Sequence, residues 1–191
     1  MVLLKTLAHQ ILSQKVNVGD IVIDATTGNG NDTLLLARKV GATGRVFGFD
    51  IQPKAITATT KRLTSMYNLD GVTLIQACHT LMPSFIPQEY HGRVKAITFN
   101  LGYLPGGDPQ IITQPLITCQ AIQGAITLLA PTGIITILAY QGHEGGSDEI
   151  SAIAGVMQRL SDQGFLVRQH TSPAPGPILF LLSRESEATA L

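Results

Sequence analysis

Short apolar runs alternate with longer stretches of helical spacing along this 191-residue chain. The runs are rich in Val, Ile and Phe, which favour strands. The early runs are almost wholly apolar, as expected for strands buried on both faces of a sheet. Most gaps between the runs repeat apolar residues with a helical period. The predicted strands cover residues 21–23, 45–49, 72–75, 94–99, 133–139, 165–167 and 178–182, and the predicted helices cover 32–40, 53–67, 114–129 and 147–160.

The alternation predicts a single α/β domain over residues 1–191, with a mostly parallel sheet of seven strands and helices on both faces. No helical pattern separates the last two strands, and the segment 172–177 reads SPAPGP. We therefore expect the last two strands to form an antiparallel hairpin. Apolar residues at 3, 4, 7, 8, 11 and 12 predict an additional amphipathic helix at the beginning of the chain.

Composition and charge narrow the setting in which the protein works. The chain lacks a secretory leader pattern and any apolar run of about 18 residues, so we expect no membrane partner. Cys78 and Cys119 have neither disulfide nor metal-site spacing, which favours a reduced, cytoplasmic setting and no metal. Lys+Arg and Asp+Glu both number 13, so a nucleic-acid partner would have to be held by a local basic patch. Lys54, Lys61 and Arg62 share one predicted helix and are candidates, although such a face is as often simply solvated.

A glycine-containing loop follows the first predicted strand and leads into a helix, where residues 24–33 read DATTGNGNDT. Glycines at 28 and 30 allow a tight turn and close approach of the backbone to a ligand. Asp50 ends the next strand, about twenty positions beyond Gly30, where a carboxylate can accept hydrogen bonds from both hydroxyls of a ribose. The pairing indicates a nucleoside ligand. Without a ligand, the glycines would be ordinary turn residues and Asp24 a helix cap.

Two residues of this loop favour S-adenosylmethionine (SAM) over a dinucleotide. Thr33 stands where a dinucleotide-binding loop needs a third small residue. Asp24 would disfavour a pyrophosphate but suits the α-amino group of a methionine moiety. An NAD-type oxidoreductase with the same fold remains the alternative from another class, and a SAM-binding module without catalysis is a third.

The exit of the fourth predicted strand carries the second motif, because ligands of open parallel sheets bind beyond the carboxyl ends of the strands. Residues 100–108 read NLGYLPGGD, and Asn100 and Tyr103 resemble the Asn-Pro-Pro-Tyr motif of amino-group methyltransferases with both prolines replaced. An amide oxygen and an aromatic ring can orient an amine for in-line methyl transfer. Alternatively, Asn100 caps a turn and Tyr103 packs on the surface.

Two histidines that follow predicted strands, and so lie near the carboxyl ends of the parallel strands, are further candidates for the site. His143 lies in the polar segment after the fifth strand and could take a proton from the amine, although loop histidines more often only form hydrogen bonds. His79 follows the third strand and could line an adenine pocket or cap a turn.

The motifs together resemble one family. DATxGNGxDT at 24–33, FDIQ at 49–52, NLGYLPGGD at 100–108 and YxGHxGG at 140–146 are similar to the small bacterial methyltransferases long labelled putative rRNA methylases. The resemblance implies a class I (Rossmann-like) methyltransferase fold and SAM as cofactor. It also implies methylation of 5-aminomethyluridine, or its 2-thio form, at the tRNA wobble position, giving the 5-methylaminomethyl nucleoside. Asn31, where the family usually has histidine, and the altered 172–177 segment keep rRNA or a small amine metabolite as alternative substrates.

The motifs and the resemblance define the candidate site residues. The sequence does not define the oligomeric state, for which a homodimer is a candidate, and tRNA, through its anticodon loop, is the expected partner. The catalytic candidates are Asn100, Tyr103 and His143, and the cofactor-binding candidates are Asp24, Thr26, Gly28, Asn29, Gly30, Asn31, Asp32, Thr33, Asp50, Gln52, His79 and Asn100.

Overall fold

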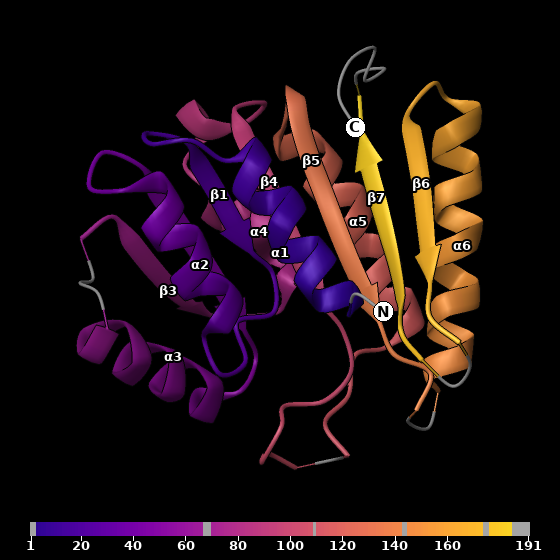
Figure 1. Ribbon diagram of the computed structural model, residues 1–191, viewed down its shortest axis with the longest axis horizontal. Helices are drawn as coiled ribbons and strands as arrows, with labels where there is room; N and C mark the ends of the chain where they lie inside the picture. Colours follow the sequence, from indigo (N-terminus) through magenta and orange to yellow (C-terminus); the bar gives the residue numbers. More distant parts are fainter. Residues whose placement is uncertain (1–2, 67–69, 109, 143–144, 174–175, 185–191) are drawn as a thin grey trace.

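A computed structural model gives the fold, and it describes residues 3–66, 70–108, 110–142, 145–173 and 176–184. Seven strands form one sheet with the order β3-β2-β1-β4-β5-β7-β6 (Figure 1). The strands are β1 (Ile21–Asp24), β2 (Arg45–Asp50), β3 (Val72–Gln76), β4 (Val94–Asn100), β5 (Leu129–Ala139), β6 (Leu166–Thr171) and β7 (Ile178–Ser183). The helices are α1 (Leu4–Lys15), α2 (Asn31–Val40), α3 (Pro53–Met66), α4 (Met82–Phe85), α5 (Pro115–Leu128) and α6 (Gly146–Asp162), with short 3₁₀ turns η1 (His79–Leu81) and η2 (Gln88–Tyr90).

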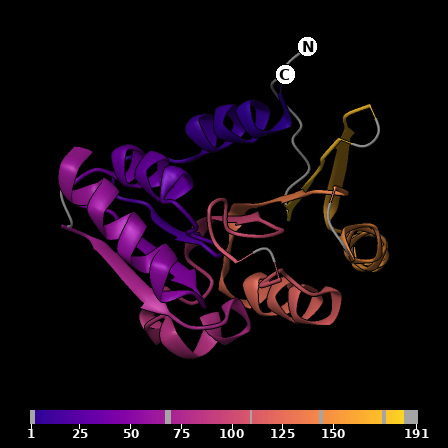
Figure 2. The same cartoon turned by 90° about the horizontal axis from the view of Figure 1, so that it is seen from below.

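The strands β1 to β5 are mutually parallel, so their carboxyl ends lie at the same edge of the sheet. The segment between β4 and α5 hangs below this edge in Figure 1, and Figure 2 looks onto the edge from below. The last two strands pair antiparallel, which confirms the predicted hairpin. Strand β7 also lies between β5 and β6 and is antiparallel to both.

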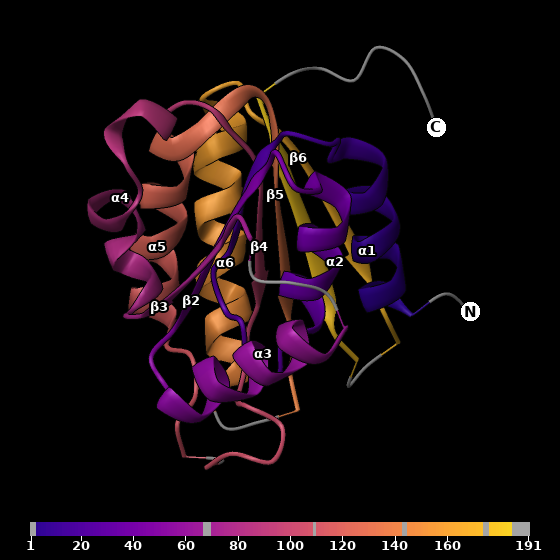
Figure 3. The ribbon, with the colours of Figure 1, turned by 90° about the vertical axis from the view of Figure 1, so that its left-hand side faces the viewer.

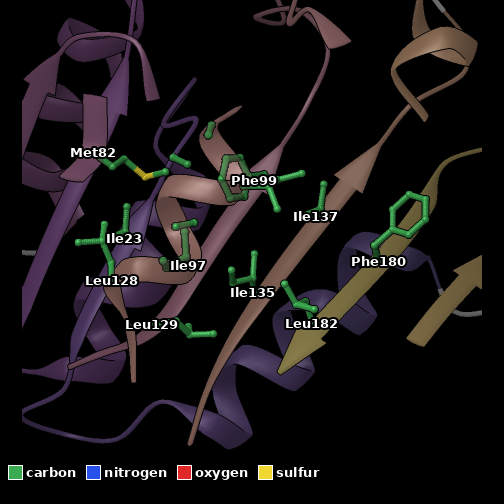
Figure 4. Packing of buried hydrophobic residues seen from close by; sticks show 14 of the residues in the cluster. Ile23, Met82, Ile97, Phe99, Leu128, Leu129, Ile135, Ile137, Phe180 and Leu182 are labelled. Carbon is green, nitrogen blue, oxygen red and sulfur yellow. The ribbon is translucent and has the colours of Figure 1, made fainter. Parts of the chain in front are cut away.

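Helices cover both faces of the sheet, as the alternating pattern predicts. The side view in Figure 3 shows α1 and α2 on one face and α4, α5 and α6 on the other. On the second face, the apolar core joins the strands to α5 and α6 (Figure 4), with Ile97, Phe99, Ile137 and Leu128 fully or almost fully buried. On the first face, Val22 and Val46 pack with residues of α1, α2 and α3. Alternate side chains of one strand thus serve opposite cores, as the pleat of a strand requires.

The structure differs from the predicted elements at two strands and one connection. Strand β5 begins at Leu129, directly after α5, because Leu129 already pairs with Val94 of β4; a register shift follows before Ile134 pairs with Ala96. Strand β6 extends to Thr171, because polar residues such as Arg168 can lie exposed on an edge strand without an apolar pattern. The short turns over 79–90 lack the repeats needed to predict them. Among the described helices, none has the length and apolar character to cross a membrane.

Candidate active site

A cavity of about 660 Å³ opens at the carboxyl ends of the parallel strands. Its volume is typical of sites for small molecules and cofactors. Segments that follow β1, β2, β3, β4 and β5 line it, and α1 contributes Lys5. The predicted site residues that line the cavity are Thr26, Gly28, Asn29, Asn31, Asp32, Asp50, Gln52, His79, Asn100 and Tyr103.

The loop after β1 lies close to β2 and α3. Gly28 and Gly30 have φ angles of 51° and 77°, in the left-handed region that favours glycine. Backbone packing also restricts Gly30, because a Cβ atom there would lie 2.9 Å from the Cα atom of Thr59 on α3. The Thr59 hydroxyl donates a 3.1 Å hydrogen bond to the carbonyl of Gly28. The loop is therefore held with its backbone toward the cavity.

Asp50 connects this loop to the end of β2. Its two carboxylate oxygens accept hydrogen bonds from the backbone N–H groups of Gly28, at 3.0 Å, and Gln52, at 2.9 Å. Burial raises the pKa of Asp50, and the backbone hydrogen bonds partly offset this effect. Each carboxylate oxygen keeps a further lone pair, so Asp50 can still accept hydrogen bonds from a ligand in the cavity.

Three predicted cofactor-binding residues do not line the cavity: Asp24, Gly30 and Thr33. Asp24 is completely buried, and its carboxylate accepts hydrogen bonds from the Thr33 hydroxyl at 2.6 Å and the Thr26 N–H at 3.2 Å. Burial, followed by the negative charge of Asp32, raises the pKa of Asp24 to about 7. Asp24 thus holds the loop through hydrogen bonds on the side away from the cavity. Asp32 is the carboxylate of this motif that lines the cavity.

Asn100 lies at the centre of the predicted amine site. Its backbone N–H donates to the Thr26 hydroxyl at 2.7 Å, which fixes the end of β4 against the loop after β1. Its side-chain Nδ2 donates to Oδ2 of Asp32 at 3.4 Å. Because an ionised carboxylate can only accept hydrogen bonds, this contact orients the amide and leaves its oxygen as the atom available to a substrate.

The segment after Asn100 forms a wall of the cavity and is anchored at its base. Tyr103 forms an isolated antiparallel bridge with Ile112, and its side chain is half exposed. Below this bridge the Thr113 hydroxyl accepts a hydrogen bond from the Gly102 N–H and donates to Glu149. Glu149 is buried and also accepts a hydrogen bond from Thr118 of α5. The segment is thus ordered by a buried carboxylate on α6, which the sequence motifs did not indicate.

His79 lies on the side of the cavity formed by the end of β3. It is largely buried, and its ring contacts Phe99 edge to face. Within the part of the chain that the structure describes, its Nε2 atom has no hydrogen-bond partner. Burial lowers the pKa of His79, which favours the neutral ring. A buried ring nitrogen without a partner is costly unless a ligand supplies one.

Several cavity residues were not among the predicted ones. Tyr140 follows β5, and burial and the charge of Asp32 raise the pKa of its hydroxyl. Lys5 lies on α1, one helical turn before His9, whose Nε2 is 2.6 Å from Oδ1 of Asp32. The spacing of Lys5 and His9 on one helix face was the only signal available in the sequence. His143, predicted as a catalytic residue, lies outside the described residues.

Two of the three cations of the candidate basic patch have structural contacts. Lys54 donates to the Gly106 carbonyl and Arg62 donates to the Asn29 carbonyl at 2.6 Å. Both therefore connect α3 to the loops that border the cavity. Among the residues that the structure describes, no cluster of three or more His, Cys, Asp or Glu side chains could hold a metal ion.

Comparison with known proteins places the chain in a family. Residues 46–176 match the protein family described as "Putative rRNA methylase". A chloroplastic tRNA (mnm(5)s(2)U34)-methyltransferase from Arabidopsis thaliana is 39% identical over an alignment that covers 94% of this chain and 69% of the relative.

Two solved structures share the fold closely. A "putative rRNA-methylase" from Clostridium thermocellum is 41% identical, with a TM-score of 0.90 over 96% of this chain and 98% of the other. A "putative methyltransferase" from Streptococcus mutans, solved in complex with S-adenosylhomocysteine (SAH), is 32% identical, with a TM-score of 0.80 over 93% of this chain and 96% of the other. These findings confirm the family resemblance read from the motifs.

Proposed function

Because this chain belongs to the rRNA methylase family and is a SAM-dependent methyltransferase, we propose that it methylates the side-chain amine of 5-aminomethyluridine, or of its 2-thio form, at the tRNA wobble position. The product would be the corresponding 5-methylaminomethyl nucleoside. The observation that carries the proposal is the Asn100 amide, which Asp32 orients with its oxygen available to an amine beside the cofactor cavity.

The residues of the cavity fit SAM. Asp50 can accept hydrogen bonds from the ribose hydroxyls, and Gly28 brings the backbone of the loop to the cavity. The unpartnered Nε2 of His79 can form a hydrogen bond with the adenine. The SAH complex of the Streptococcus mutans relative supports this fit.

Bound SAM supplies a methyl group on a positively charged sulfur. The work of the protein is then to align a neutral nucleophile about 3 Å from the methyl carbon and in line with the bond that breaks. In this proposal the Asn100 amide oxygen accepts a hydrogen bond from the amine, and the Tyr103 ring confines the base that carries it. The lone pair of the amine attacks the methyl carbon, and the electrons of the carbon–sulfur bond move to sulfur.

The tRNA substrate is supported by the Arabidopsis relative, whose name specifies wobble uridine U34. An anticodon loop presents unstacked bases that a pocket can admit. The alternatives are an rRNA base and a small amine, because Asn31 and the segment 172–177 differ from the family pattern. An NAD-type oxidoreductase is disfavoured by the family membership. The cytoplasmic setting stays a prediction. It rests on the two cysteines, Cys78 and Cys119, which are both free thiols.

Nucleoside mass spectrometry of tRNA from a strain that lacks this protein tests the proposal. The aminomethyl nucleoside should accumulate in that strain. The same tRNA should gain one methyl group per wobble base when it is incubated with purified protein and SAM. The Asn100→Ala variant serves as the matched control and should leave most of the tRNA unmodified.

Unchanged wobble nucleosides in the deletion strain, together with loss of a methylated rRNA base or small amine, would refute the tRNA assignment. The assignment to SAM-dependent methyltransferases would stand in that case. Labelled SAM incubated with bulk tRNA, rRNA or small amines would then identify the acceptor.

A further inference from the structure

An alkylammonium group must lose a proton before it can accept a methyl group, because only the neutral amine has a lone pair. The ordinary pKa of such groups is near that of lysine, about 10.4, so only a small fraction is neutral at pH 7. The site therefore needs a group that takes this proton, and the question is which described residue is placed to do so.

Asp32 is the carboxylate that contacts Asn100, the residue proposed to bind the amine. It lies in the first turn of α2, lines the cavity, and contacts the Asn100 amide through Oδ2. Its other oxygen, Oδ1, is 2.6 Å from Nε2 of His9 on α1. The Asp32 side chain is 8% exposed and that of His9 is 30% exposed, so the carboxylate is the more buried of the two. At so short a distance from an anionic oxygen, Nε2 carries a hydrogen and donates it.

The other titratable groups near this position are less suitable. Asp24, on β1, is buried beneath the loop and does not line the cavity. Tyr140, beyond β5, has a pKa raised by burial and by the charge of Asp32, so its hydroxyl stays protonated near neutral pH. His79 lies at the end of β3, and burial lowers its pKa.

We infer that Asp32 takes the proton of the substrate ammonium through Oδ2 and that His9 is the positioning residue that holds Asp32 for this step. In the step, an N–H bond of the ammonium breaks, its electron pair stays on nitrogen, and the proton moves to Oδ2 of Asp32. The amine then attacks the methyl carbon as described above, and Asp32 releases its proton to solvent after product leaves. This inference rests on the proposed function, since it requires an acceptor that is protonated in solution.

The pH dependence of single-turnover methyl transfer distinguishes proton removal from a merely structural role. With undermodified tRNA at pH 7, Asp32→Asn should reduce the rate roughly a hundredfold, the usual scale of a lost general base. The deficit should shrink to a fewfold at about pH 9.5, where solvent removes much more of the proton from an alkylammonium. A deficit that is the same at all pH values would overturn the inference, as would an equally large loss of SAM affinity.

Substitution of His9 tests the positioning role. His9→Gln keeps an N–H donor for Oδ1 of Asp32, whereas His9→Ala removes it. We expect His9→Ala to lower the rate about tenfold, in line with one lost charge-assisted hydrogen bond, and His9→Gln to restore most of it, with SAM affinity within twofold of wild type for both. The matched control is His91→Gln, because His91 lies before β4, at the opposite edge of the sheet, and contacts the Ile86 carbonyl. Equal activity of His9→Ala and wild type would overturn this role.

A measurement without substrate separates this inference from the proposed function. The imidazole ¹⁵N resonances of His9 should shift in Asp32→Asn and stay unchanged in a variant of the distant Asp162. Failure of the wild type to methylate tRNA would refute the proposed function alone, and the pH comparison would then be made with the acceptor that labelled SAM identifies. The inference would be overturned if the acceptor had no ionisable amine. It would also be overturned if the His9 resonances did not shift in Asp32→Asn.

Discussion

At the scale of single residues, we expect cofactor affinity to depend strongly on Asp50. Asp50→Ala should weaken SAM binding at least tenfold, because each charge-assisted hydrogen bond to a ribose hydroxyl contributes about 1.5–3 kcal/mol. Isothermal titration with SAM measures the change. Circular dichroism should confirm that the variant is folded, because Asp50 also accepts hydrogen bonds from Gly28 and Gln52. An unchanged dissociation constant in a folded variant would contradict the role of Asp50.

Asn100 should affect turnover more than cofactor binding. Asn100→Ala removes the proposed acceptor for the amine but keeps the backbone N–H that donates to Thr26. We expect the rate of methyl transfer to fall roughly a hundredfold while the SAM dissociation constant stays within a fewfold of wild type. Rapid-quench kinetics and SAM titration of the same preparation separate the two quantities. If the rate and the SAM affinity fell together, Asn100 would instead be a residue that binds the cofactor.

Asp24 should make stability depend on pH. Its pKa is raised from 3.8 to about 7 in the folded protein, first by burial and then by the charge of Asp32. The folded state therefore binds this proton more tightly than the unfolded state, and the stabilisation is present below about pH 4 and is lost as the pH rises through about 7. Asp24→Asn cannot ionise, so it should flatten the pH dependence of the free energy of unfolding between pH 5 and 8.

Urea unfolding at several pH values measures this slope. Asp162→Asn is a suitable control, because Asp162 is exposed and accepts a hydrogen bond from Gln158, one turn earlier on the same helix. Its slope should match that of the wild type. A wild-type slope in Asp24→Asn would show that the Asp24 carboxyl does not hold its proton in the folded state.

At the scale of elements, the loop after β1 fits against α3 only because residue 30 is glycine. Gly30 has a φ of 77°, and a Cβ atom there would contact the Thr59 backbone at 2.9 Å. Gly92 has a similar φ of 70° with nothing within 4 Å of the corresponding position, so it isolates the backbone effect. Gly92→Ala should cost about 1 kcal/mol of unfolding free energy. Gly30→Ala should cost about 1–3 kcal/mol more and also weaken SAM binding.

Denaturant unfolding of both variants, with SAM titration alongside, checks this prediction. Equal stability of the two alanine variants would contradict the packing argument. Weakened SAM binding by Gly92→Ala would show that the cofactor effect is not specific to the loop.

The same elements show what the sequence could and could not predict. Strands such as β1 were predictable because burial on both faces makes them almost wholly apolar. The position of Asp32 in the cavity, rather than Asp24, depends on how α2 turns away from β1, and no spacing rule encodes that. His9 could not be connected to the site from sequence, because α1 reaches Asp32 only through tertiary packing. Glu149 was missed for the same reason.

At the scale of the whole molecule, the two ends of the cavity belong to different parts of the sheet. Asp50 ends β2 and His79 follows β3, whereas Asn100 ends β4 and Tyr140 follows β5. The crevice between the two groups lies where the order of the strands reverses at β1. A ligand that spans both groups must therefore connect segments that are distant in sequence. Such a ligand should stabilise the molecule as a whole rather than one loop.

Thermal unfolding tests that expectation and separates the two nucleotide classes. A ligand at a concentration of about 100 times its dissociation constant adds about 2.7 kcal/mol to the free energy of unfolding, which for a domain of this size corresponds to roughly 5–10 °C. We expect SAM and SAH to raise the melting temperature by this amount and NADH to leave it unchanged. Asp50→Ala should lose about half of the shift or more at the same SAM concentration, because a dissociation constant at least tenfold higher leaves no more than about 1.4 kcal/mol of stabilisation. A shift produced by NADH and not by SAM would contradict the cofactor assignment, since both ligands would meet the same ribose-binding carboxylate and differ only in what the rest of the cavity accepts.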